Sequence, residues 1–180
     1  MISDIKDCSG LNEGTMKRIL AVSTTGMGDC LMSAPALRAL RKSFPDLHID
    51  FVVNSAWKSL FLGNPHITRL IGYHSQWYRQ PFVGLRLWDY RYDHVLIFHA
   101  NRDFGRLMPW IRTTSIWATQ PLPWVPDDRR ILTSNPVHGI AKRIGLAEKI
   151  GARDDGGQME IFFDDKDRSR NARFMKKKGL

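Results

Sequence analysis

A strand-turn-helix pattern lies near the start of the sequence, in Arg18-Ile-Leu-Ala-Val-Ser-Thr-Thr-Gly-Met-Gly-Asp29. The apolar run that ends at Thr24 is typical of a strand buried on both faces. Two glycines, Gly26 and Gly28, are expected to let the backbone turn sharply, and a helical pattern then continues to about Ser43. This order predicts a parallel sheet with a binding edge at the carboxyl ends of its strands.

The alternation of strand and helix patterns continues along the chain and indicates the fold class. Further strands are expected at 49–53, 68–72, 93–98 and 115–118, and helical segments at 55–62, 102–111 and 137–144. Five or six strands alternating with helices predict an α/β fold with a doubly wound, mainly parallel, Rossmann-like sheet.

The expected organisation is a leader at 1–15, one domain at 16–163 and a terminal helix at 164–180. A chain of 180 residues is long enough for one domain with a proper core. The aromatic and basic segment 74–92 has no clean period, so it is expected to be irregular or partly helical. An apolar run at 159–163 follows the break at Gly156-Gly157.

The formal net charge of +9 favours an anionic partner, which could be nucleic acid, an anionic membrane face or a phosphorylated substrate. Many arginines fall among aromatic residues between Arg86 and Arg130, although scattered surface charge is the simpler alternative. No recognition-helix, zinc-finger or aromatic RNA-binding motif is present, so nucleic acid is not expected as a partner.

The cysteines and the apolar runs bear on location. Cys8 and Cys30 cannot form a disulfide framework and have no metal-ligand spacing, so both are expected to be free thiols. The leader has no apolar run of the signal-peptide kind, and no segment reaches the ~20 apolar residues needed to cross a bilayer. The expected location is cytoplasmic, with at most contact with a membrane surface.

The turn at Gly26 leaves several interpretations open. Asp is a favoured helix N-cap, and from spacing alone Asp29 fits a cap better than a catalyst. A dinucleotide-binding turn would need glycine where Leu31 stands and an acidic residue where Asn54 stands. A phosphate-binding loop of the Walker type would need a Gly-Lys-Ser/Thr ending, which is missing.

The segment Lys17-Arg-Ile-Leu-Ala-Val-Ser-Thr-Thr-Gly-Met-Gly-Asp-Cys-Leu-Met-Ser-Ala-Pro-Ala-Leu-Arg-Ala-Leu-Arg41 resembles the opening of the family 9 glycosyltransferases, the bacterial heptosyltransferases among them. The resemblance continues through 44–53, 64–67 and 92–102, and resumes at His138. It implies the N-terminal, acceptor-binding half of a two-domain enzyme of the GT-B fold. The half that binds the sugar nucleotide is then expected to lie outside these 180 residues, and the isolated chain is expected to be inactive.

The resemblance also implies roles for particular residues. Asp29 takes the place of the general base that deprotonates the acceptor hydroxyl in a metal-independent, inverting transfer. His99, Asn101 and Arg102 follow the strand at 93–98, where acceptor hydroxyls or phosphates would be held, although Asn101 could instead cap the next helix and Arg102 could be solvated. Arg106 lies one helical turn after Arg102 and could bind the same anion, and His138 matches a histidine of the family. Together with residues of the glycine turn, they are expected to bind the acceptor. These residues are Thr25, Gly26, Gly28, His99, Asn101, Arg102, Arg106 and His138.

The implied partners are an anionic glycan or glycolipid acceptor and, through the other half, a nucleotide sugar such as ADP-heptose. No cofactor or metal is expected, and the implied location is the cytoplasm with peripheral contact at the inner membrane. The competing hypothesis is a non-catalytic α/β module that binds nucleotides or polyanions with its positive face and glycine turn.

Overall fold

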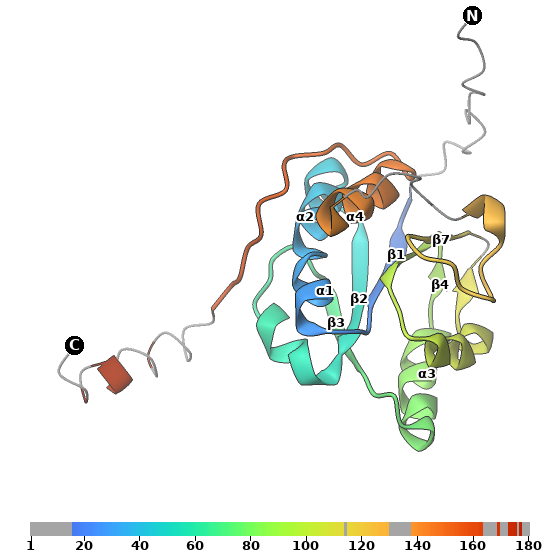
Figure 1. The fold of residues 1–180 in the computed structure, drawn as a ribbon, viewed down its shortest axis with the longest axis horizontal. Helices are drawn as coiled ribbons and strands as arrows, with labels where there is room; N and C mark the ends of the chain where they lie inside the picture. The colour runs from blue at the N-terminus through green and yellow to red at the C-terminus, as the bar shows by residue number, and fades with distance from the viewer. Residues whose placement is uncertain are drawn as a thin grey trace, which may run out of the picture.

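The architecture is a five-stranded parallel sheet with helices on both faces, shown in Figure 1. The computed structural model describes residues 16–113, 115–129 and 138–163, and also Ser169, 173–175 and Lys177. The strand order is β3-β2-β1-β5-β7, and every neighbouring pair is parallel. The strands are β1 (Arg18–Ser23), β2 (His48–Asn54), β3 (Arg69–Tyr73), β5 (His94–His99) and β7 (Ile116–Ala118). The predicted doubly wound, mainly parallel α/β fold is confirmed.

Alternate residues of the central strand feed two separate cores. Ile19 and Ala21 belong to one core, while Leu20 and Val22 belong to the other, and all four are fully buried. A strand buried on both faces needs a continuous apolar run, which is why this segment lacks the alternation of a half-exposed strand.

Helices cover the two faces in two groups. The first core is covered by α1 (Met27–Leu31), α2 (Ala34–Ser43), the 3-10 helix η1 (Ser55–Phe61) and α4 (Gly139–Glu148). The second core is covered by α3 (Gln80–Trp88) and the 3-10 helix η3 (Arg102–Trp110). Short elements complete the described fold, namely η2 (Trp77–Arg79), η4 (Asp127–Arg129) and the parallel pair β4 (Arg91–Tyr92) and β6 (Arg112–Thr113).

Several local expectations need correction. The helix expected to run to Ser43 breaks at Met32 and Ser33, and Pro35 then lies in the first turn of α2, where its missing N–H costs nothing. The predicted helices at 55–62 and 102–111 are 3-10 helices. The N-cap of η1 is Asn54, whose side chain accepts from the Ala56 amide. The Ser55 hydroxyl donates to the Tyr73 carbonyl, at 2.7 Å.

The segment after α4 forms no strand; it is an extended strap over α2. Arg38 is 4% exposed and holds the strap: its guanidinium donates to the Asp155 carboxylate at 2.8 Å and to the carbonyls of Gly156 and Gln158. Glu160 also pairs with Arg38, at 2.9 Å. These contacts hold the strap against α2, and 159–163 pairs with no described strand of the sheet.

Parts of the expected organisation lie outside the described residues. The leader at 1–15, Cys8 and the helix start at Asn135-Pro136 are among them. Of the terminal segment 164–180, the residues that are described are helical. Cys30 is a buried free thiol, as predicted. In the described part of the chain, no helix combines the length and the apolar character needed to cross a bilayer.

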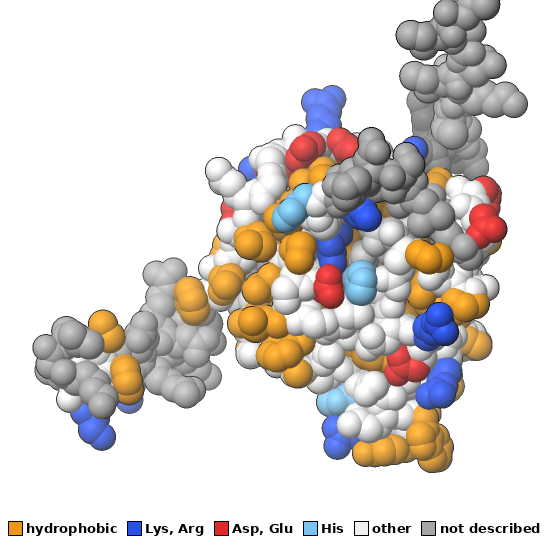
Figure 2. Space-filling model, viewed as in Figure 1, with side chains coloured by type: hydrophobic (Ala, Val, Ile, Leu, Met, Phe, Trp, Pro, Cys, Tyr) orange, Lys and Arg blue, Asp and Glu red, His pale blue; other side chains and the backbone are white. Residues whose placement is uncertain are grey.

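Apolar side chains also gather on the surface, at the lower edge of Figure 2 over the end of α3. The segment 74–92, expected to be irregular or partly helical, is mostly helical: η2 leads into α3, and the second core buries Val83 and Leu87.

Glycine substitutions in two helices should have opposite effects on stability. A Cβ at Gly84 would lie 2.6 Å from the rigid Trp110 ring, whereas a Cβ at Gly145 has nothing nearer than a Glu148 oxygen at 3.9 Å. We expect Gly84→Ala to lower the free energy of unfolding by about 1–3 kcal/mol through overpacking. Gly145→Ala should raise it by up to about 1 kcal/mol through helix propensity. Urea unfolding measures both; a Gly84→Ala protein as stable as its parent would contradict the α3–η3 packing.

Candidate functional site

The candidate site lies where the strand order reverses. From β1 the chain adds β2 and β3 on one side of the sheet and later adds β5 and β7 on the other. The loops that leave β1 and β5 therefore diverge, and in sheets of this kind the ligand crevice is expected between such loops, at the carboxyl ends of the strands. Asp29 follows β1 and His99 ends β5, so both reach this edge, which lies low in the view of Figure 1.

Thr24 joins the ends of three strands at this edge. Its amide donates to the His99 carbonyl at 2.9 Å, and its hydroxyl accepts from the Asn101 amide at 3.2 Å. Its carbonyl accepts from the side-chain amides of Asn54 and Asn101, each at 3.2 Å. Asn101 thus braces the β1 turn and does not cap η3 with its side chain. Asn54, at the end of β2, holds the same turn through its bond to the Thr24 carbonyl.

Two side chains hold the Asp29 carboxylate: one is distant in sequence, and the other lies in the loop between β1 and α1. Arg143 donates to one oxygen at 3.1 Å, and the Thr25 hydroxyl donates to the other at 3.0 Å. Gly26 is the N-cap of α1 and Asp29 lies within the first turn, so the helix-cap interpretation of Asp29 is wrong. Its side chain remains 34% exposed, so a ligand in the crevice can reach it.

His99 completes the cluster through Thr25. The His99 Nδ1 atom lies 2.8 Å from the Thr25 hydroxyl and 3.7 Å from the Asp29 carboxylate. A hydroxyl has one proton, and Thr25 donates it to Asp29, so Nδ1 must be the donor in the contact with Thr25. Neutral His99 then keeps the lone pair on Nε2. Burial lowers the pKa of His99, Asp29 raises it and Arg143 lowers it, with a net shift downwards.

Arg143 belongs to this cluster although no motif in the sequence points to it. It is 3% exposed within α4, and its guanidinium also donates to the Gly139 carbonyl at 2.8 Å. Its Nε atom is buried with no hydrogen-bond partner among the described residues. The available signal was an arginine three residues after Ile140 and next to Ile144, on the apolar face of a helix. A charge in that position needs a buried partner, and Asp29 supplies it.

The two glycines and two arginines predicted to bind the acceptor form no hydrogen bond or ion pair with the Asp29 side chain. Gly26 has φ −68°, so the sharp turn needs no left-handed backbone there, and Gly28 lies inside α1. Arg102 and Arg106 are exposed, and neither forms an ion pair with a described residue. In a 3-10 helix, residues four apart are separated by about 120°, so Arg102 and Arg106 do not lie above one another on one face of η3.

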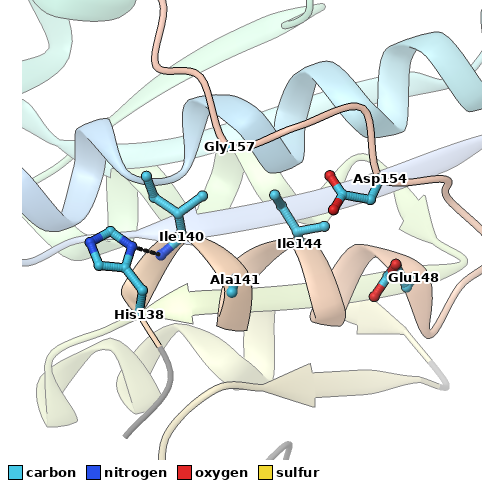
Figure 3. A pocket seen from close by; sticks show the side chains of 7 residues that line it. All are labelled: His138, Ile140, Ala141, Ile144, Glu148, Asp154 and Gly157. Atoms are coloured by element: carbon cyan, nitrogen blue, oxygen red, sulfur yellow. Dashed lines mark hydrogen bonds between the residues drawn. The ribbon is translucent and has the colours of Figure 1, made fainter.

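His138 directly precedes Gly139, whose carbonyl binds the Arg143 guanidinium. Its ring accepts from the Ile140 amide at 3.3 Å and so caps α4, and it lines a cavity of about 410 Å³ between α4 and the strap, as Figure 3 shows. No hydrogen bond or ion pair between described residues joins His138 to Asp29 or His99. Through residues 16–113, 115–129 and 138–163, no three His, Cys, Asp or Glu side chains cluster as metal ligands.

The charges around His99 should move its pKa in opposite directions. Asp29→Asn removes the group that favours the imidazolium, so we expect the His99 pKa to fall further. Arg143→Met removes the opposing cation, so the pKa should rise. NMR titration of the imidazole protons measures both shifts. An unchanged pKa in Asp29→Asn would mean that the carboxylate and the ring do not face each other in solution.

The lowered pKa also predicts a pH dependence of stability. The unfolded chain binds the His99 proton more tightly than the folded one, so stability should decrease as the pH falls below about 6.5. A His99→Gln protein should lose less stability over this range. Equal losses in parent and variant would contradict the burial of this ring.

Comparison with known proteins shows which solved structures share this fold. No protein-family model and no curated protein matches the sequence. A family 9 glycosyl transferase from Veillonella parvula DSM 2008 superposes with a TM-score of 0.76 at 22% identity over 91% of this chain. The E. coli heptosyltransferase WaaC with ADP gives 0.66 at 18% identity over 79% of the chain. E. coli ADP-heptose lps heptosyltransferase II gives 0.57 at 16% identity over 88%.

The chain spans 50% of the length of each of these three proteins. The resemblance inferred from residues 17–41 is therefore confirmed at the level of structure. This chain has the Rossmann-like α/β fold of one half of a family 9 glycosyltransferase.

Proposed function

We propose that this chain is the acceptor-binding half of an inverting glycosyltransferase that moves heptose, or a related sugar, from a nucleotide sugar to an anionic glycan or glycolipid. The observation that carries the proposal is the Asp29 carboxylate, held at the switch point of the sheet by Arg143 and Thr25 and still open to the crevice. The choice of donor rests on the E. coli heptosyltransferase WaaC, whose structures are with ADP and with ADP-2-deoxy-2-fluoro heptose.

In the proposed reaction, Asp29 accepts the proton of the acceptor hydroxyl. The hydroxyl oxygen forms a bond to the anomeric carbon of the sugar, and the bond between that carbon and the nucleotide diphosphate breaks with its electron pair on the diphosphate. Arg143 donates to one carboxylate oxygen and Thr25 to the other, so the proton is proposed to go to a remaining lone pair of the carboxylate. A base needs to approach within ~2.6–3.2 Å of that hydroxyl.

The residues around Asp29 have positioning roles in this scheme. Arg143 and Thr25 fix the rotamer of the carboxylate, and His99 supports Thr25 from β5. Asn54 and Asn101 fix the loop that carries the base. Arg102 and Arg106 are proposed to attract the anionic group of the acceptor, since their charges are exposed and unpaired among the described residues.

Replacement of Asp29 tests the proposed base. In an enzyme that also contains a nucleotide-sugar-binding half, we expect Asp29→Asn to lower the rate of transfer by about 10²–10⁴-fold, the usual contribution of a general base. The matched control is Asp103→Asn, which alters another carboxylate, one that accepts from the Tyr73 hydroxyl at 2.7 Å. Transfer is measured by release of the nucleoside diphosphate. A folded Asp29→Asn enzyme with near-parental turnover would reject Asp29 as the base.

Titration of the 180-residue chain separates this function from nucleotide binding. We expect the anionic acceptor to bind more tightly than ADP-heptose, and its affinity to fall with salt, because exposed charges are screened over about 8 Å at physiological ionic strength. The joint change Arg102→Gln and Arg106→Gln should weaken this salt dependence, whereas Arg91→Gln should leave it unchanged. Tighter binding of ADP-heptose would instead support a nucleotide-binding module.

A further inference from the structure

The outer face of η2 and α3 exposes five large apolar side chains, named here the η2–α3 face. Its members are Trp77, Tyr78, Phe82, Leu85 and Trp88. Trp77 is 72% exposed and Phe82 is 70% exposed, values unusual for the two largest kinds of apolar side chain. The inner side of α3 is also apolar, because Val83 and Leu87 pack in the second core. A helix that is apolar on both sides is normally covered on both sides.

The charges at this face are positive. Arg79 and Arg86 are exposed among the apolar side chains, and Asp89 is the only acidic residue from 74 to 92. Neither arginine forms an ion pair with a described residue; Arg79 lies instead over the Tyr78 ring at 5.8 Å and near the His74 ring. The neighbouring helix η3, which packs against α3, adds the exposed Arg102 and Arg106.

The apolar and positive character of this face favours a bilayer surface over a second copy of the chain. A second copy of the chain would place Arg79 and Arg86 of both copies against each other, because a two-fold interface pairs the same patch on each subunit. A bilayer surface with anionic lipids accommodates both features. Tryptophan and tyrosine prefer the headgroup region, and arginines beside them are attracted to anionic headgroups.

We propose that the η2–α3 face binds the surface of an anionic bilayer, with Trp77, Phe82 and Trp88 at the boundary between headgroups and acyl chains. The segment projects beyond the carboxyl-end edge of the sheet, the same edge that carries Asp29 (Figure 1), and the apolar side chains gather at that end of the molecule (Figure 2). Bound in this way, the crevice opens towards the lipid surface. The inference stands on the exposure and charge of this face and does not depend on sugar transfer.

Vesicle flotation of the 180-residue protein tests the proposal. The vesicles are phosphatidylcholine alone and phosphatidylcholine mixed with phosphatidylglycerol. We expect binding to the mixed vesicles, together with a blue shift of tryptophan fluorescence. The joint change Trp77→Ser and Phe82→Ser should weaken this binding on the order of tenfold or more, since both apolar anchors are lost. Leu62→Ser is the matched control, because Leu62 is an exposed apolar residue (46%) outside the face, and it should bind like the parent.

A second pair of substitutions and a check of folding complete the experiment. Arg79→Gln with Arg86→Gln should reduce binding to the mixed vesicles, as expected if these charges contact anionic headgroups. Circular dichroism and urea unfolding establish that each variant is folded. Adsorption of the whole basic chain by charge alone would survive the Trp77 and Phe82 substitutions and would overturn the proposal. A dimer that dissociates in that variant, with no vesicle binding by the parent, would overturn it in favour of a second copy. These readouts involve no transfer, so their failure leaves the proposed reaction untouched.

Discussion

The hydrogen bonds of Thr24 are the constraint on which the candidate site depends. A buried threonine at the end of β1 binds the chain leaving β5 through its amide and its hydroxyl, and its carbonyl binds the asparagine that ends β2. Three parallel strands would otherwise end in three independent loops. Because the buried backbone groups must be satisfied, the loops are locked to one another, and the side chains they carry occupy fixed relative positions.

The second constraint is electrostatic. Arg143 is nearly inaccessible to solvent, and a buried guanidinium is stable only when its charge is matched. Asp29 supplies the match, and the pair ties α4 to the turn after β1 across 114 positions of sequence. The Asp29 side chain nevertheless stays 34% exposed. The contact that neutralises the buried Arg143 therefore also fixes the orientation of Asp29, the proposed base.

The two edges of the sheet differ in how far their carboxylates are enclosed. At the carboxyl-end edge, polar side chains converge and the η2–α3 face stays apolar and positive. At the other edge, Asp50 is fully buried beneath Arg18 and Arg69, and the Tyr92 hydroxyl donates to the same carboxylate at 2.8 Å. That carboxylate is enclosed by its partners and has no opening of the kind seen at Asp29. Location at the switch point, and not ion pairing as such, distinguishes the candidate site.

The sequence by itself determined what depends on local pattern. Apolar runs located the five strands to within one or two residues, and the position of Asp29 and His99 after β1 and β5 placed both at one edge of the sheet. The distinction between α and 3-10 turns at η1 and η3 was decided by packing, since the two differ little in sequence period. The segment 159–163 looked like a strand because its apolar run was real, but it pairs with no described strand, and Arg38 binds the carbonyls of Gly156 and Gln158 just before it. The partnership of Arg143 with Asp29 and the uncovered side of α3 were decided only by the tertiary structure. Both depend on which helix lies against which loop, and no spacing within a single segment encodes that.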